Sequence, residues 1–484
     1  MDLSIRTLTR QTSIYGLFQI LQRGVGFAVI PFYTHFLNPE QFGSLDILYL
    51  IVWFVGIVGG SKLDAAFIRY HANAQSSNTL GSLLSSSLIG LASFATVFCG
   101  AAALSARPIL RLMFATQDIP ISGFYLALSA TWLELVASLP LAYLRINHRA
   151  RIVGTLGLAR SIVAAAVGLF CVSVLHLGVE GILTGAVIGG VATAGTGYLL
   201  MLRNERITFD TRYTWPLYRY ALPMLPAPLF MYLLNYADRF LLVKYSSLAV
   251  VGIYGMAYKF AMLANLAVMG PFGEMWGANQ FNLYQAERKE TYRKIALLYV
   301  SVLYLAALCI TYFSYDITLV AFEKSYHGLM ELVAPLTVGV AIWGIVPTLD
   351  FGCLVRNKTW LRSLTTGIAA LINIVLNFVL IRRFGAAGAA LATLLSFIAL
   401  TTITYALNRL LTDYCVDVRK AAVMSAGLML FACLSYASPY VPYGMFLSLR
   451  ILALTLFAWL TLRMNGIGLR DVLQYFHRQS VAHG

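Results

Sequence analysis

The chain has 484 residues, of which 59% are hydrophobic and only 11% are charged. Soluble globular domains carry about 25% charged residues, so this composition excludes most water-soluble enzymes and indicates a protein embedded in a membrane. Lysine and arginine number 35 against 20 aspartate and glutamate, which gives a formal net charge of +15. In a membrane protein such an excess is expected in cytoplasmic loops, so it does not indicate a nucleic-acid partner.

A helix needs about 20 apolar residues to cross the hydrocarbon layer, and the sequence contains about fourteen such stretches. The first is longer than the core of a signal peptide and has no small-residue cleavage site, so we expect it to remain as a spanning helix. Pro223, Pro226 and Pro228 predict a kink in the seventh. In chain order the predicted spans are 12–34, 43–66, 80–104, 121–144, 153–175, 182–202, 217–243, 248–270, 295–315, 329–352, 363–381, 386–408, 421–437 and 446–464.

The positive charges predict the orientation of these spans. With the N-terminus inside the cell, cytoplasmic segments hold about 24 Lys and Arg residues and external segments about six. Positively charged segments resist translocation, so this bias predicts that both termini are cytoplasmic. The fold class predicted is therefore an all-α integral membrane protein that crosses the bilayer many times.

A weak internal repeat predicts two similar halves. Phe42-Gly43 matches Val251-Gly252, and the Gly178–Gly181 segment matches Gly385–Gly388. An even number of spans in each half gives both the same orientation, so we expect two lobes related by a pseudo-two-fold axis along the membrane normal. The predicted divisions are a six-helix lobe at 1–205, a second at 206–410, and two appended helices with a cytoplasmic tail at 411–484. Transporters place their substrate site between lobes of this kind.

Motifs for enzymatic chemistry are missing from the sequence. It contains no Gly-rich phosphate loop, no HExxH and no GxSxG, and its six cysteines lack the spacing of metal ligands. The longest polar stretch, from about residue 274 to 294, is too short for a catalytic domain. We therefore expect a transporter rather than an enzyme, with no metal or organic cofactor. Trp276 in this stretch is interpreted either as an interfacial anchor or as part of a cytoplasmic entrance.

Charged and amide side chains inside the predicted spans are the candidates for function, because they need a partner or a watery cavity. Gln19 and Arg23 are four residues apart and share a helical face. A cavity with deep cations favours an anionic ligand, and the planar guanidinium suits phosphate. Two structural alternatives are that Arg23 pairs with Glu134 and that Lys259 extends to the aqueous edge. The predicted substrate-binding residues are Arg23, Lys259, Arg160, Gln19 and Gln22.

A second set of residues is predicted to serve ion coupling or gating: Glu134, Asp238, Arg239 and Asp64. Glu134 lies deep in the fourth span and is a candidate proton carrier. Asp238 and Arg239 are adjacent and are expected to point in different directions on a helix. We favour a structural ion pair or an interfacial anchor for these two, with gating or proton coupling as the alternative.

Several motifs carry a resemblance to a known family. They are Leu37–Gly43, the Tyr220–Pro226 segment followed by Asn235–Phe240, the Val251–Tyr254 segment followed by Ala257–Lys259, and Asn373 and Asn377 followed by Phe384–Thr393. Over nearly the whole chain, to about Leu410, the sequence resembles the Wzx-type polysaccharide repeat-unit flippases of the multidrug/oligosaccharidyl-lipid/polysaccharide exporter superfamily. It departs from the family at Trp276–Ala278, where a proline often follows the aromatic residue.

The resemblance implies fourteen helices in two lobes, a cationic central cavity and alternating access in the bacterial inner membrane. Its implied cargo is an oligosaccharide on undecaprenyl pyrophosphate, moved from the cytoplasmic to the outer leaflet for O-antigen, capsule or exopolysaccharide synthesis. Arg23, Lys259 and Arg160 would then hold the pyrophosphate. A proton or sodium gradient, or consumption of the product outside, would drive transport. Expected partners are membrane lipids and the polysaccharide polymerase machinery.

Two alternative functions remain at this point. A lipid II flippase shares the cationic lumen and is poorly separated by sequence. A cation-coupled multidrug exporter of the same superfamily predicts an acidic, apolar pocket, which the deep Arg and Lys residues disfavour.

Overall fold

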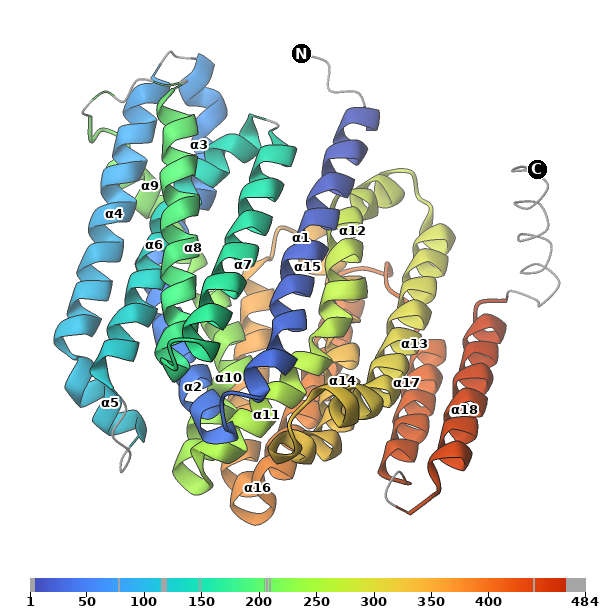
Figure 1. Ribbon diagram of the computed structural model, residues 1–484. Coiled ribbons are helices and arrows are strands. Elements are labelled where there is room, and N and C mark those ends of the chain that lie inside the picture. The colour runs from blue at the N-terminus through green and yellow to red at the C-terminus, as the bar shows by residue number, and fades with distance from the viewer. Residues whose placement is uncertain are drawn as a thin grey trace, which may run out of the picture. The chain divides into compact units, whose positions relative to one another are not determined.

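The computed structural model describes residues 5–76, 79–114, 120–147, 149–203, 205, 208, 210–437 and 440–466, with side chains described from residue 16 onward except at residues 76 and 278. All regular secondary structure in these ranges is helical (Figure 1). Contacts divide the chain into two compact units. Unit 1 comprises Met1–Gly255 and Ala321–Tyr326, and unit 2 comprises Met256–Val320 and His327–Gly484. The predicted division into lobes at 205/206 and 410/411 stays a prediction.

Unit 1 contains the helices of the N-terminal half. α7 packs against α1 and α8, while α6 packs against α8 and α4, and these helices run alongside one another (Figure 1). The helices are α1 (Ile5–Thr34), α2 (Pro39–Gly60), α3 (Leu63–Ser76), α4 (Leu80–Leu104), α5 (Ala106–Phe114), α6 (Ile121–Ile146), α7 (Ala150–Ser173), α8 (Gly178–Leu202), α9 (Thr214–Ala221), η1 (Leu222–Met224) and α10 (Pro226–Tyr245). The first part of α11 (Leu248–Ala261) completes the unit.

Unit 2 continues from the middle of α11. In it α14 packs against α16 and α17, and α17 packs against α18. Its remaining elements are the π-helical η2 (Asn265–Met269), α12 (Gly270–Gln285), α13 (Lys289–Ala321), η3 (Lys324–Leu329), α14 (Met330–Trp343), η4 (Val346–Thr348), α15 (Phe351–Val355), α16 (Trp360–Leu411), α17 (Val418–Ala432), η5 (Cys433–Ala437) and α18 (Tyr443–Met464). Ala321, the last residue of α13, and the first half of η3, up to Tyr326, belong to unit 1.

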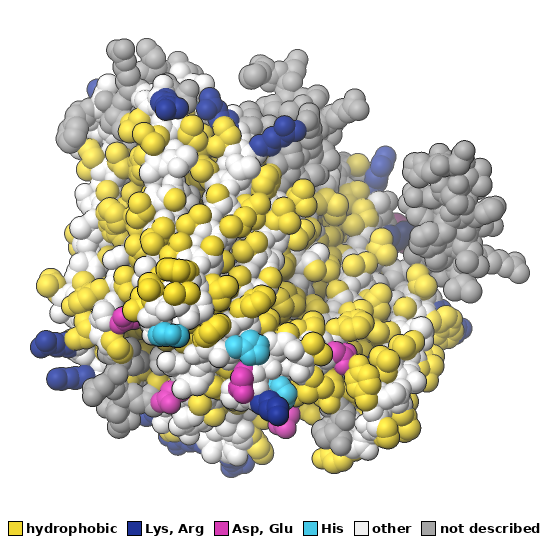
Figure 2. Space-filling view, viewed as in Figure 1, with side chains coloured by type: hydrophobic (Ala, Val, Ile, Leu, Met, Phe, Trp, Pro, Cys, Tyr) yellow, Lys and Arg dark blue, Asp and Glu magenta, His cyan; other side chains and the backbone are white. Residues whose placement is uncertain are grey.

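The apolar surface agrees with a multi-pass membrane protein. Over the helices of unit 1 hydrophobic side chains dominate the lateral surface, and Lys and Arg gather toward the helix ends (Figure 2). Among the described residues, eleven helical segments are long and apolar enough to cross a membrane. The all-helical membrane fold is thus confirmed, whereas fourteen crossings and cytoplasmic termini stay predictions.

Local sequence signals explain where several helices begin and end. Asn38 and Gln41 form a reciprocal capping box at the start of α2, with Pro39 at its first turn. The same helix ends where Ser61 and Lys62 take φ values of 49° and 56°. These left-handed residues divide the predicted span 43–66, so that α2 ends at Gly60 and α3 begins at Leu63.

Prolines and one glycine produce the other breaks. The predicted kink near Pro223 is confirmed, because η1 separates α9 from α10. Within α16, Gly385 has φ 55° and ψ −130°, which a residue without a Cβ adopts readily. This break lies between the predicted spans 363–381 and 386–408, so α16 consists of two helices joined at Gly385.

Two helical segments were not predicted. The polar stretch from residue 274 to 294 is mostly helical, because α12 extends to Gln285 and α13 begins at Lys289. The short helix α5 was not expected within the external segment. Its apolar residues Ala106, Leu110 and Phe114 recur every four positions and are buried, which is the pattern of a helix lying on a protein surface.

The two glycines of the internal repeat make a close helix contact in unit 1. A Cβ on Gly43 would lie 1.9 Å from the carbonyl oxygen of Leu248, and one on Gly252 would lie 2.0 Å from that of Pro39. The starts of α2 and α11 therefore touch through their backbones, and the repeated Gly residues have a shared packing role.

We predict that Gly43→Ala and Gly252→Ala each destabilise unit 1 by about 1–3 kcal/mol, because the added methyl group forces the backbones apart. Thermal melting of the detergent-solubilised chain, followed by the fraction that stays monodisperse, measures the effect. Gly100→Ala is the matched control, since nothing lies within 4 Å of its Cβ position in α4. Equal melting temperatures for all three variants would contradict the close contact.

Candidate functional site

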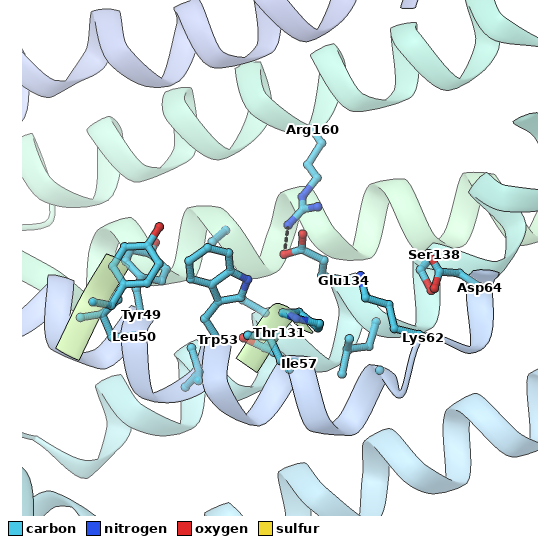
Figure 3. A pocket seen from close by; sticks show the side chains of 18 of the residues that line it. Tyr49, Leu50, Trp53, Ile57, Lys62, Asp64, Thr131, Glu134, Ser138 and Arg160 are labelled. Carbon is cyan, nitrogen blue, oxygen red and sulfur yellow. Dashed lines mark hydrogen bonds and ion pairs between the residues drawn. The ribbon is translucent and has the colours of Figure 1, made fainter. Parts of the chain in front are cut away.

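A cavity of about 570 Å³ lies inside unit 1 (Figure 3). Helices α2, α6, α7, α8 and α10 supply its walls, together with residues at the α2–α3 break. The polar and aromatic side chains in the lining are Asp46, Tyr49, Trp53, Lys62, Asp64, Thr131, Glu134, Ser138, Arg160 and Tyr236. Because these groups lie within helices of spanning length, they mark a polar chamber in an otherwise apolar bundle.

Helical periodicity explains why these side chains meet. Along α2 the lining residues include Asp46, Tyr49, Trp53 and Ile57, which are spaced by three or four and share one face. On α6 the same spacing brings Thr131, Glu134 and Ser138 to one side. Asp46 and Trp53 were not among the residues predicted from the sequence, although their spacing along α2 indicates a shared helical face.

Glu134 and Arg160 form an ion pair at the cavity. Arg160 Nη2 lies 3.0 Å from Glu134 Oε2, and the two side chains are 30% and 63% exposed, respectively. Figure 3 shows the pair linking α7 to α6 between the aromatic end and the Lys62–Asp64 end of the cavity. The alternative in which Arg23 is the partner of Glu134 is therefore wrong, because α7 supplies that partner.

The cavity carries no positive excess. Its lining holds three carboxylates, Asp46, Asp64 and Glu134, and two cations, Lys62 and Arg160, so the formal sum of charges is 2 − 3 = −1. Three of the predicted site residues, Arg160, Glu134 and Asp64, thus come together here.

The predicted α1 residues lie beside α7. Gln22 Nε2 donates to the carbonyl oxygen of Gly154 at 3.4 Å, which fits the packing of α1 along α7. Gln19 and Arg23 are exposed on the same helix. None of the three is part of the cavity lining. Lys259 belongs to unit 2, where it is half-buried near the end of α11.

Asp238 and Arg239 belong to a buried network in unit 1. Arg239 Nε donates to Asp46 Oδ2 at 2.7 Å, and its Nη1 lies 3.5 Å from Asp238 Oδ1. Tyr254 donates its hydroxyl hydrogen to Asp238 Oδ2 at 2.5 Å. Asp238 and Arg239 side chains are 1% and 3% exposed. Although adjacent in sequence, the two therefore meet in one network that ties α10 to α2 and α11.

Trp276 has a different environment from either of those predicted. It is 2% exposed, stacks on Phe272 at 5.1 Å, and donates its indole N–H to the Pro347 carbonyl at 3.2 Å. Trp276 is therefore a core residue of unit 2, and both the anchor and the entrance interpretations are wrong. The polar residues next to Trp276 in the sequence gave no indication that it is buried. The aromatic cluster around its indole includes Tyr292, which comes from the next helix.

We predict that Asp46→Asn lowers stability far more than Glu134→Gln. Removing one partner of a buried ion pair costs about 3–5 kcal/mol, whereas an exposed pair contributes about 0–1 kcal/mol. Arg239 is the buried group left with one fewer carboxylate in the first variant. Melting temperatures of the solubilised variants test this. If Glu134→Gln melts at as low a temperature as Asp46→Asn, the exposed fraction of an ion pair does not determine its contribution to stability.

The sequence has relatives among known proteins. The sequence profile of a family described as "Polysaccharide biosynthesis protein" matches residues 8–276. Among curated proteins, the chain is 23% identical over 285 residues to the succinoglycan biosynthesis transport protein ExoT of Rhizobium meliloti (strain 1021). That match spans 56% of this chain and 54% of the relative, so it covers only about half of each protein.

Solved structures show the same architecture. The fold is similar to that of lipid II flippase MurJ in an inward closed conformation, with TM-score 0.71 and 14% identity over 95% of this chain and 99% of that one. It is also similar to an inward-facing multidrug resistance MATE family transporter of the MOP superfamily, with TM-score 0.62 and 13% identity, over 82% of this chain and 94% of that one. At these identities the likeness shows the fold alone.

Proposed function

Because the chain belongs to the family of polysaccharide biosynthesis proteins, we propose that it is a flippase for an undecaprenyl-pyrophosphate-linked oligosaccharide repeat unit. It moves this unit from the cytoplasmic to the outer leaflet of the bacterial inner membrane, for O-antigen, capsule or exopolysaccharide synthesis. The family match carries the proposal. The similarity to a succinoglycan transport protein and the fold shared with a lipid II flippase support it.

The polar cavity of unit 1 is the structural feature that suits such a cargo. Ionised groups inside spanning helices cost at least about 2.5–3.5 kcal/mol each on insertion scales unless they are paired or hydrated. A chamber lined by Glu134, Arg160, Lys62 and Asp64 therefore holds water or a hydrophilic ligand. The sugars of a lipid-linked glycan are such a ligand, while its hydrocarbon tail stays in the bilayer.

We assign the pyrophosphate to Arg23 of unit 1 and Lys259 of unit 2, and the amides of Gln19 and Gln22 belong to α1 with Arg23. Guanidinium and ammonium groups bind phosphate oxygens through charge-assisted hydrogen bonds. Arg160 already donates to Glu134, so part of its charge is compensated before any cargo binds. This pairing reduces the attraction of Arg160 for phosphate.

Transport is proposed to draw on a proton or sodium gradient, with Glu134, Asp64, Asp238 and Arg239 as the candidate coupling or gating groups. Consumption of the product by polysaccharide polymerase machinery outside would also favour transport toward the outer leaflet. Proteoliposomes with imposed gradients test the coupling. Flipping at one rate with and without both gradients would exclude it.

A cation-coupled multidrug exporter is the second candidate, and the carboxylates Asp46, Asp64 and Glu134 in the cavity favour it. Lys62 and Arg160 in the same lining weaken the attraction for a cationic drug. Drug susceptibility separates the candidates: expression that raises resistance to cationic drugs without restoring a glycan would favour export of drugs. A lipid II flippase would rescue peptidoglycan synthesis and would not restore a dispensable polysaccharide.

We predict that the chain restores one surface polysaccharide in a panel of bacterial strains that each lack one flippase. In the restored strain Arg23→Ala and Lys259→Ala should abolish export, because the pyrophosphate loses a cationic ligand. Immunoblots of membranes confirm that each variant is present. Arg111→Ala on the exposed face of α5 is the control that retains export. Full export by both variants at normal abundance would remove the pyrophosphate assignment.

A further inference from the structure

We propose that the cavity of unit 1 binds the sugar portion of the cargo, with the indole of Trp53 as its stacking platform and the Glu134–Arg160 pair as its hydrogen-bonding partner. The pyrophosphate is held elsewhere. This inference rests on the proposed function and adds which part of the cargo occupies which part of the protein.

Trp53 has the geometry of a platform. Its side chain contacts Tyr236 edge-to-face, with ring centroids 5.0 Å apart, and Tyr232 in the same manner at 6.1 Å. Tyr232 is itself buried and donates its hydroxyl hydrogen to the carbonyl of Leu50 at 2.9 Å. These contacts from α10 fix the orientation of the indole. Half of the residue nevertheless stays accessible, at 50% exposure, and it lines the cavity (Figure 3).

An exposed, immobilised indole beside polar groups suits a pyranose ring. One face of such a ring presents C–H groups, which are apolar and pack against an aromatic face, while the hydroxyl groups radiate around the rim. Tyr49 lies one turn before Trp53 on α2 and widens the aromatic end of the cavity (Figure 3). The volume of 570 Å³ is within the range of about 300–1,000 Å³ that small-ligand pockets have.

The ion pair supplies what the hydroxyl groups need. A sugar hydroxyl both donates and accepts, so a neighbouring carboxylate and guanidinium satisfy it from two sides. Glu134 and Arg160 remain 63% and 30% exposed while bonded to each other, which leaves further donor and acceptor positions open to a ligand. Thr131 and Ser138 bring hydroxyl groups from the same face of α6.

The charge of the lining separates sugar from pyrophosphate. A pyrophosphate in this cavity would meet three carboxylates and two cations, and the pairs Arg160–Glu134 and Arg239–Asp46 leave the lining without an excess of positive charge. Like charges at close range disfavour binding. The carboxylates do not repel an uncharged sugar, so the cavity favours the glycan over the pyrophosphate, which we assign to other cations.

The test uses the full chain in detergent and two separate probes. The first probe is the free repeat-unit oligosaccharide of the glycan that the chain restores, released from its lipid by mild acid and tritium-labelled. The second is inorganic pyrophosphate. Affinities are measured by equilibrium dialysis for the wild type, Trp53→Ala, Trp53→Phe and Trp215→Ala. Trp215 is an exposed tryptophan on α9 that does not line the cavity.

We expect Trp53→Ala to weaken oligosaccharide binding at least about tenfold, which corresponds to about 1.4 kcal/mol, and to leave pyrophosphate binding unchanged. Trp53→Phe should weaken it by no more than about threefold, because an aromatic face remains. Trp215→Ala should bind both probes as the wild type does. If Trp53→Ala does not fold, Trp53→Leu replaces it, since leucine fills volume without an aromatic face.

Oligosaccharide affinity within about twofold of wild type in Trp53→Ala or Trp53→Leu would overturn the inference, as would an equal loss for both probes. Either result, in a chain that still restores a glycan, leaves the proposed function intact. A wild-type chain that restores no glycan in any strain would instead overturn the proposed function, and the sugar site with it.

Discussion

The cost of an ionised group in hydrocarbon is the constraint on which the structure of unit 1 depends. The chain meets it in two ways. Arg239 is sealed from solvent and bonded to Asp46 and Asp238, so its charge is compensated within the protein. Arg160 and Glu134 are bonded to each other but remain accessible at a cavity, so water or ligand completes their solvation. In unit 2, buried Arg450 similarly pairs with the partly exposed Asp316 at 2.7 Å.

The exposed fraction of a charged side chain therefore indicates whether its ion pair stabilises the fold or is accessible to a ligand. A sealed pair joins helices, as Arg239 joins α10 to α2, and its replacement disturbs folding before it disturbs binding. An accessible pair contributes little to stability because water screens it, yet it presents donors and acceptors to whatever enters the cavity. Asp46 both stabilises the fold and contributes to the cavity, since it bonds to Arg239 and also lines the cavity. It thereby connects the packing of α2 and α10 to the shape of the chamber.

The spans were predictable because an apolar stretch of helix length is a local signal, and so were the breaks at Pro223 and Gly385. The partners of the charged residues were not. Asp46 and Arg239 are 193 positions apart, and no spacing rule links them. The sequence therefore predicted Arg239 as a site residue but missed the carboxylate that compensates it. The burial of Trp276 was not predicted for the same reason, because Pro347 and Tyr292, which contact its indole, come from other elements.

Fold similarity does not identify the cargo, because a lipid II flippase and a multidrug transporter share the architecture at 13–14% identity with this chain. The side chains facing the cavity must make that choice. A cationic drug needs unbalanced carboxylates, and a pyrophosphate needs unbalanced cations. The unit 1 cavity is close to charge balance and contains an accessible indole fixed by Tyr236. Such a surface gains most from a ligand that is itself uncharged, rich in hydroxyl groups and apolar on one face, which is the chemistry of a sugar ring.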